Sequence, residues 1–111
     1  QGVDVTKGLK PGGWILLNSP EAPQKLDAFS GYRLAFVDAT QIAVKNDLGT
    51  RTHPIINTAM IGAFARMMGI PPLDTISEAI QAEITTKPDK NIQASKEAYE
   101  QVSLNAKVVQ I

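Results

Sequence analysis

Two short apolar runs stand out in the first forty residues of the chain. Residues 14–18 read Trp-Ile-Leu-Leu-Asn and residues 34–38 read Leu-Ala-Phe-Val-Asp, so each run ends on a polar residue. Four consecutive apolar residues are typical of a strand that is covered on both faces. About fifteen residues separate the two runs, which suffices for a crossover connection and exceeds a tight hairpin. We therefore predict two parallel strands.

After the second run, the apolar residues follow the 3.6-residue period of helices. Thr40 and Asp74 are suited to cap the first and third of these helices at their N-termini. Pro54 fits the first turn of the second helix, and Gly69 fits its C-terminal end. The pattern as a whole predicts four helices, near 41–47, 54–68, 74–84 and 89–104.

This inventory of elements is incomplete for an α/β domain. Residues 4–9 are predicted to end a short helix, but only two strands follow it, and a parallel sheet needs neighbouring strands and cover on both faces. We expect further strands to come from elsewhere, most simply from a missing N-terminal half. The first residue is Gln1, which agrees with a fragment or a processed product. Residues 1–111 are therefore predicted to be the C-terminal portion of a single domain.

The composition excludes several classes of function. Hydrophobic residues make up 43% of the chain and charged residues 20%, which is ordinary for a globular domain. Eleven basic and eleven acidic residues cancel, so no net field favours nucleic acid or an anionic membrane. Without cysteine, the chain has no disulfide and no thiolate ligand for a metal or cluster. Residues 55–70 are too short and too polar to span a membrane, and no secretory signal is visible, so a cytoplasmic protein is expected.

The ends of the two apolar runs are where an open α/β sheet would place a ligand. They carry Asn18 and Asp38, followed by Thr40. The same residue types also begin helices and form turns, and we favour this structural interpretation. Pro-Gly-Gly at 11–13 precedes a strand, whereas a phosphate-binding loop follows one, so we interpret it as a plain turn.

Catalytic or metal-binding constellations are not evident. His53 is the sole histidine, which disfavours both a metal site and a serine triad. Two pairs of glutamates, Glu78 with Glu83 and Glu97 with Glu100, are predicted to lie on solvated helix faces. We therefore assign no catalytic and no metal-ligating residue.

The loop at 48–54 is the segment richest in polar chemistry. Thr50, Arg51 and Thr52 precede a predicted helix N-terminus, a place suited to anions such as a phosphate or a carboxylate. These three residues are weak candidates for such a contact. The alternative is that Thr52 or His53 caps the helix while Arg51 pairs with a neighbouring chain.

The helix predicted at 54–68 is apolar around nearly its whole circumference, which predicts burial on all sides. Glycine in a helix interior costs about 1 kcal/mol against alanine, so Gly62 indicates close packing. Large apolar residues form a second stripe at spacings of 4, 4 and 3. We predict a core or subunit-interface role for this helix, with the packing residues Ile56, Asn57, Met60, Gly62, Ala63, Phe64 and Met67.

The same helix carries a resemblance to a known family. Residues 57–65, Asn-Thr-Ala-Met-Ile-Gly-Ala-Phe-Ala, resemble a segment of the gamma subunit of 2-oxoacid:ferredoxin oxidoreductases, above all of the pyruvate branch, pyruvate synthase. Other pieces agree in order: Leu-Lys-Pro-Gly-Gly at 9–13, the stretch 38–49, and Lys-Pro-Asp-Lys-Asn at 87–91 with Ala-Tyr-Glu at 98–100. The resemblance covers about residues 3–100.

The resemblance implies a partial Rossmann-like α/β domain in an oxidoreductase complex of anaerobic metabolism. Such a complex converts pyruvate or a related 2-oxoacid and coenzyme A to acyl-CoA and CO2, and reduces ferredoxin. It implies thiamine pyrophosphate, Mg, [4Fe-4S] clusters and coenzyme A in the complex, with none bound by this chain alone. The implied partners are alpha, beta and delta-type subunits, with ferredoxin as acceptor. The family's glycine-rich G-x-G-G-Q-G-type loop is absent here, so no ligand-binding residue is transferred.

Two other functions stay open at this point. The segment 9–13 before an apolar strand also resembles a part of class I methyltransferases, which would make the chain a Rossmann fragment that binds S-adenosylmethionine. Those enzymes also need a glycine-rich loop and an acidic ribose ligand upstream. The third interpretation is a non-catalytic interaction module.

Overall fold

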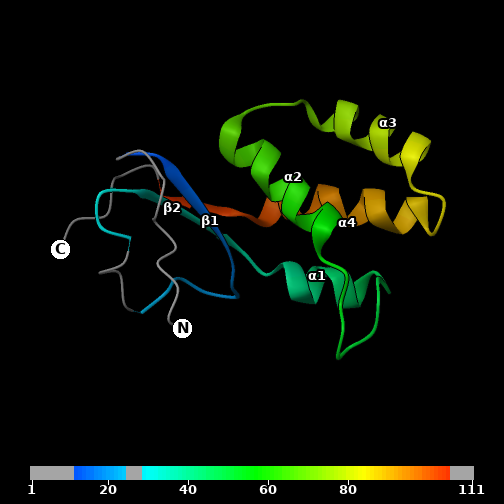
Figure 1. Ribbon diagram of the computed structural model, residues 1–111, viewed down its shortest axis with the longest axis horizontal. Helices are drawn as coiled ribbons and strands as arrows, with labels where there is room; N and C mark the ends of the chain where they lie inside the picture. Colours follow the sequence, from blue (N-terminus) through cyan, green and yellow to red (C-terminus); the bar gives the residue numbers. More distant parts are fainter. Residues whose placement is uncertain (1–11, 25–28, 106–111) are drawn as a thin grey trace.

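The computed structural model describes residues 12–24 and 29–105 of the chain, so the helix end predicted at 4–9 lies outside the described residues. The described part is a small sheet that continues into a group of helices (Figure 1). Its elements, in chain order, are β1 (Trp14–Asn18), β2 (Arg33–Val37), α1 (Ala39–Lys45), α2 (Asn57–Met68), α3 (Leu73–Glu83), α4 (Pro88–Gln101) and β3 (Ser103–Asn105).

The sheet has the strand order β1-β2-β3. β1 and β2 pair in parallel, with Trp14 opposite Arg33 and Asn18 opposite Val37, which confirms the two predicted parallel strands. β3 pairs with β2 in the antiparallel direction, with Ser103 opposite Phe36. This places the end of α4 near the C-terminal end of β2.

The predicted extension of the last helix to residue 104 is wrong. α4 ends at Gln101, and Val102 adopts φ −58° and ψ 132°, outside the helical region. The next three residues instead satisfy the open edge of β2, where unpaired backbone groups need partners. Interstrand hydrogen bonding therefore outweighs the helical pattern at this end.

Two of the predicted helix caps also differ from the structure. Asp38, not Thr40, caps α1, because its carboxylate accepts a hydrogen bond from the Gln41 N–H at 3.0 Å. Asp74 lies inside the first turn of α3, where its negative charge interacts favourably with the helix dipole. The residue before this helix is Pro72.

The second helix begins later than predicted and ends as predicted. Pro54 forms an isolated β-bridge with Gly49, so α2 starts only at Asn57. Gly69 ends the helix in a left-handed conformation, with φ 77°, and its N–H donates to the Ala65 carbonyl. The glycine stop is confirmed.

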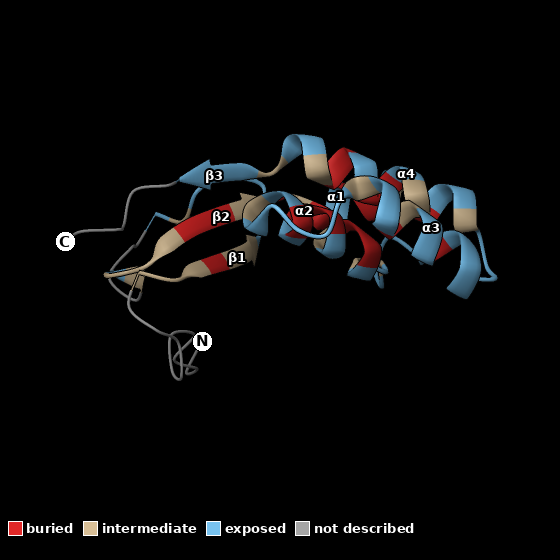
Figure 2. Cartoon of the chain, turned by 90° about the horizontal axis from the view of Figure 1, so that it is seen from above, coloured by how far each residue is buried: buried red, intermediate tan, exposed pale blue. Residues whose placement is uncertain are grey.

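The main core lies where α1, α2 and α4 meet the end of the sheet (Figure 2). Small residues dominate it, which lets the helices approach closely. Its buried members are Val37, Ala39, Ile42, Ala43, Leu48, Ala59, Ala63, Ala94 and Ala98. A second cluster joins Ala65 of α2 to Ile76 and Ile80 of α3, with Ile92 and Tyr99 of α4 beside it.

Candidate functional site

Close contact between two helix backbones fixes α2. A Cβ atom placed on Gly62 would overlap the carbonyl oxygen of Ser95 on α4. The neighbouring Ala59 and Ala63 are 1% and 0% exposed, and Ala98 of α4 is 0% exposed. The packing reason predicted for Gly62 is confirmed, since only glycine permits this approach.

A buried polar pair lies beside this crossing, and the sequence pattern did not predict it. The Thr58 hydroxyl donates to the Asn91 side-chain oxygen at 2.9 Å. The Asn91 amide nitrogen donates in turn to the Lys87 carbonyl at 2.9 Å and to the Thr86 carbonyl at 3.2 Å. The pair thus ties α2 to the start of α4 while satisfying groups that are out of contact with water. The sequence signals this pair only through an asparagine in the first turns of one helix and a threonine on the facing helix.

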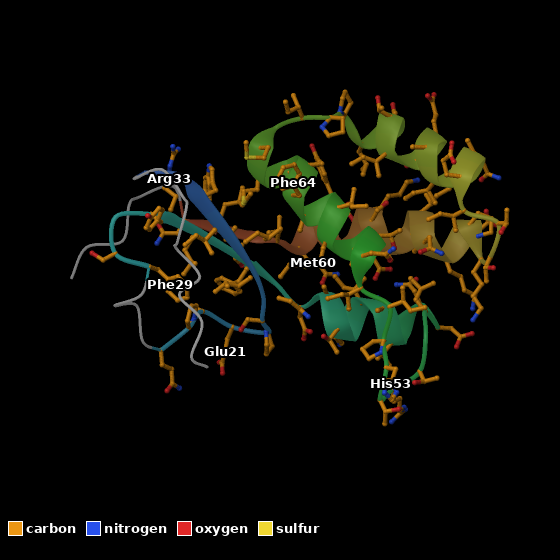
Figure 3. All side chains as sticks on the ribbon, viewed as in Figure 1. Glu21, Phe29, Arg33, His53, Met60 and Phe64 are labelled. Carbon is orange, nitrogen blue, oxygen red and sulfur yellow. The ribbon has the colours of Figure 1, made fainter. Side chains whose placement is uncertain are left out.

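The opposite face of α2 is exposed in this chain, so the chain by itself buries only one side of the helix. Ile61, Phe64 and Met68 are 46%, 48% and 47% exposed. Their spacing of three and four residues places them on one stripe, which we call the α2 apolar stripe. Met60, one turn before Phe64 along the helix, is half-buried against the core (Figure 3). Among the described residues, nothing buries the α2 apolar stripe to the same extent.

The remaining predicted packing residues divide between core and surface. Ile56 is half-buried and packs on the main core. Asn57 is exposed at the first turn of α2, where its side-chain oxygen accepts from the Thr58 N–H. Met67 is half-buried. Small residues on α2 are therefore buried, while the large residues extend from half-buried to exposed.

The polar loop before α2 is organised by its own side chains. The Thr50 hydroxyl accepts from the His53 N–H at 3.0 Å and lies 3.3 Å from the Thr52 hydroxyl. The Thr52 hydroxyl lies 3.1 Å from Nδ1 of His53, near the tip of the loop (Figure 3). Neither Thr52 nor His53 caps α2, because the residue before the helix is Ile56 and it makes no side-chain cap. The cap prediction is wrong.

Arg51 is exposed on this loop. Within the described residues, its guanidinium has no hydrogen bond or ion pair, unlike that of Arg66, which donates to the Tyr99 carbonyl. Of the three candidate residues for anion contact, Thr50 and Thr52 are thus engaged with the loop itself and Arg51 is available.

The strand ends hold α1 in place. The side-chain oxygen of Asn18 accepts from the N–H groups of Ala39 at 2.9 Å and Thr40 at 3.3 Å. Its amide nitrogen donates to the Thr40 hydroxyl at 2.9 Å. These bonds satisfy the first turn of α1, so the structural interpretation of Asn18, Asp38 and Thr40 is confirmed.

Glu97 is a correction to the predicted solvated glutamates. It is 8% exposed. Its carboxylate accepts hydrogen bonds from Gln93 at 2.9 Å and Asn46 at 3.2 Å, and the Lys45 ammonium lies 3.5 Å away. Burial raises the pKa of this carboxyl, but these donors and the ammonium together hold the pKa below its usual range. The group stays ionised and joins α1 to α4. Glu78, Glu83 and Glu100 are exposed as predicted.

Neither a metal-binding cluster nor a membrane-spanning helix is found among the described residues. Across residues 12–24 and 29–105, no three His, Asp or Glu side chains converge in a way that could hold a metal ion. In the same ranges, no helix is both long enough and apolar enough to cross a membrane.

Comparison with known proteins adds the family context. Residues 2–101 match the family described as pyruvate ferredoxin/flavodoxin oxidoreductase. The chain is 41% identical over 102 residues to the pyruvate/ketoisovalerate oxidoreductases common subunit gamma of Thermococcus kodakarensis, covering 87% of this chain and 52% of that one. It is 39% identical over 101 residues to pyruvate synthase subunit PorC of Methanothermobacter marburgensis, covering 90% of this chain and 52% of that subunit.

A solved structure agrees with these relatives. The crystal structure of pyruvate oxidoreductase subunit PorC from Thermotoga maritima has a TM-score of 0.73 and 30% identity, over 89% of this chain and 56% of that one. This likeness, together with the family match, favours the oxidoreductase resemblance over the methyltransferase one. The chain spans about half the length of the relatives that it matches.

Proposed function

Because the chain belongs to the pyruvate ferredoxin/flavodoxin oxidoreductase family, we propose that it is the C-terminal portion of a gamma-type accessory subunit of a 2-oxoacid:ferredoxin oxidoreductase. The complex would oxidise pyruvate or a related 2-oxoacid. The carboxyl group leaves as CO2, the acyl group is transferred to the thiol of coenzyme A, and the two electrons pass to ferredoxin. In this proposal the chain supports the assembly and other subunits perform the chemistry.

The observation that carries the proposal is the contrast between the two faces of α2. One face is fixed in the core by backbone contact at Gly62, while the other presents Ile61, Phe64 and Met68. Large apolar side chains in a continuous exposed stripe are typical of a protein–protein interface. We propose that another subunit of the complex covers the α2 apolar stripe.

The donor set of the chain does not fit an iron–sulfur cluster, since the sequence contains no cysteine. We therefore assign the clusters, Mg and thiamine pyrophosphate of the proposed complex to the alpha, beta and delta-type subunits. We propose a cytoplasmic location for the assembly, with ferredoxin as its electron acceptor.

A narrower proposal concerns Arg51. Its guanidinium is exposed and unpaired among the described residues, on a loop that two threonines stiffen. Guanidinium groups bind phosphate through paired N–H donors. We propose that Arg51 contacts an anion, such as a phosphate of coenzyme A or a carboxylate of a neighbouring subunit.

The free edge of the sheet supports the proposed division of the domain. In the described part of the chain, β1 pairs only with β2. A parallel strand of five residues with an open edge offers backbone groups to a further strand. We propose that the N-terminal half of the gamma-type domain supplies that strand.

Co-production with the alpha, beta and delta-type subunits tests the function. We expect affinity purification through the beta subunit to recover this chain at equal stoichiometry, together with iron, thiamine pyrophosphate and pyruvate-dependent ferredoxin reduction. The same preparation is repeated with Phe64→Glu. We expect this variant to fold, because Phe64 is exposed, and to be recovered with the beta subunit in lower yield. If the catalytic subunits are purified without this chain even at low ionic strength, the proposal is overturned.

A further inference from the structure

A groove between α2 and α3 lies apart from the core and from the polar loop. α3 packs mainly on α4, through Ile76 and Ile80, and touches α2 little. The space left between α2 and α3 is a groove of about 350 Å³. In Figure 1, α3 runs along the outer side of the helical group.

The walls of the groove are apolar and its polar groups lie at the margins. Ile61 of α2 forms one wall, and Ala79 of α3 with Ile84, the residue after α3, forms the other. Four lining residues are polar. Asn57, Thr75 and Glu83 are exposed, whereas Thr58 is buried and its hydroxyl is engaged with Asn91. A site for a small polar substrate needs several polar groups that converge inside it, and this groove has its apolar surface inside. Its chemistry suits apolar side chains of a larger partner.

The two walls repeat at helical spacing. On α3, residues 75, 79 and 83 line the groove one turn apart, with Ile76, Ile80 and Ile84 beside them. An amphipathic helix inserts side chains at the same three- and four-residue spacing, so that it fits between two such rows. The α2 apolar stripe continues the apolar surface past the groove, since Ile61 belongs to both.

The charge on the two helices selects the kind of partner. α3 contains Asp74, Glu78 and Glu83 and no basic residue. α2 contains no acidic residue, and its one cation, Arg66, is engaged with Tyr99. Of the three acidic residues of α3, only Glu83 lines the groove, and no ion pair to its carboxylate is found among the described residues. A partner with basic residues beside its apolar stripe complements this surface, and an acidic partner is repelled.

We propose that the α2–α3 groove binds an amphipathic helix of another subunit of the complex, with a basic residue that pairs with Glu83 on α3. This proposal rests on the proposed function, because the partner is a subunit of the same assembly.

Site-directed photo-cross-linking in the assembled complex tests the proposal. The photoreactive amino acid benzoylphenylalanine replaces Ala79, which lines the groove, or Gln81, which is exposed about 200° away on the same helix. We expect Ala79 to cross-link to a helical segment of another subunit that bears Lys or Arg beside its apolar residues, and Gln81 to give at least tenfold less product. A product formed with a second copy of this chain, with an acidic segment or equally from both positions overturns the proposal.

Charge reversal tests the electrostatic part in the same complex. Glu83→Lys inverts a groove residue, and Glu78→Lys makes the same change on α3 outside the groove lining. We expect Glu83→Lys to lower the Ala79 cross-link yield at least fivefold at low salt and the control to lower it less. Equal effects of the two variants overturn the assigned pairing. If the chain does not assemble with the other subunits at all, the proposed function fails and the groove proposal with it; assembly without the cross-link overturns the groove proposal alone.

Discussion

Lys87 donates to two acceptors of a single residue, Asp47, although forty positions separate them in sequence. Its ammonium lies 2.7 Å from the Asp47 backbone carbonyl and 3.0 Å from its carboxylate. Both residues have positive φ, 58° for Asp47 and 51° for Lys87, a backbone conformation that residues other than glycine rarely adopt. The contact therefore joins two strained turns, one after α1 and one before α4.

The Asp47–Lys87 contact gives an expected pH dependence. The hydrogen bond from Lys87, followed by the charges of Lys87 and Lys90, holds the pKa of Asp47 below its ordinary value of 3.8. A carboxyl whose pKa is lower in the folded state stabilises the fold above its unfolded pKa, and this contribution is lost as pH falls through the folded pKa. Asp47→Asn should thus lower Tm slightly at pH 7, and the difference should vanish in acid. Thermal unfolding at both pH values measures it, and a difference that is undiminished at low pH would contradict the assignment.

Gly62→Ala should destabilise the chain by about 1–3 kcal/mol, because the added Cβ overlaps the Ser95 carbonyl. The sign is informative, since the same change in an unconstrained helix stabilises by about 1 kcal/mol. Denaturant unfolding followed by circular dichroism measures the effect. The larger Gly62→Leu should cost more, whereas Ala82→Leu on the exposed surface of α3 is the control and should change little. An unchanged midpoint for Gly62→Leu would refute the backbone contact.

Thr58→Val keeps the shape of the side chain and removes the hydroxyl that donates to Asn91. The Asn91 oxygen would then be buried without a donor, at a cost of about 1–3 kcal/mol. Thr85→Val is the matched control, because Thr85 is exposed. Equal unfolding free energies for the two variants would show that the buried pair contributes nothing.

Phe64→Ser should leave Tm of the chain nearly unchanged, because the side chain is 48% exposed. In the complex it should weaken association about tenfold or more, since burial of a phenylalanine contributes about 1.5–3 kcal/mol. Titration of the other subunits with the variant chain measures the loss. A large drop in Tm with normal association would place Phe64 in the core of the chain instead.

Arg51→Ala should leave the fold intact and raise KM for coenzyme A, or the subunit dissociation constant, about tenfold, which corresponds to one charged hydrogen bond. Arg51→Lys retains the charge but loses the paired donors, so its constants should lie between those of the parent chain and those of Arg51→Ala. Steady-state kinetics of the complex separates the outcomes. If both variants equal the parent in kinetics and assembly, Arg51 contacts no anion.

The elements that the sequence predicts well are those with a strong local pattern. β1 is recognisable from its unbroken apolar run, and the end of α2 from Gly69. β3 is different, because Ser103–Asn105 is short and exposed and exists only through its pairing with β2. No periodicity along the chain carries that information.

The same distinction applies to the candidate site. The position of Gly62 inside a predicted helix indicated that it packs closely, because glycine is unfavourable in a helix interior without such a reason. It could not indicate that Glu97 is buried, since its donors, Asn46 on the turn after α1 and Gln93 on α4, come together only in the fold. Periodicity likewise does not tell whether an apolar helix face is covered by the chain itself or by a partner, as for Phe64.

One residue, Val102, separates α4 from β3, and β3 pairs directly with β2. Because α2 touches α4 through backbone at Gly62, a displacement imposed on α2 from outside passes through α4 to the sheet with no flexible loop between them. The surface of α2 and the strand ends therefore form one mechanically continuous body. A subunit that docks on this helix would shift the strand ends with it, and α3, which packs on α4, would move with the same body.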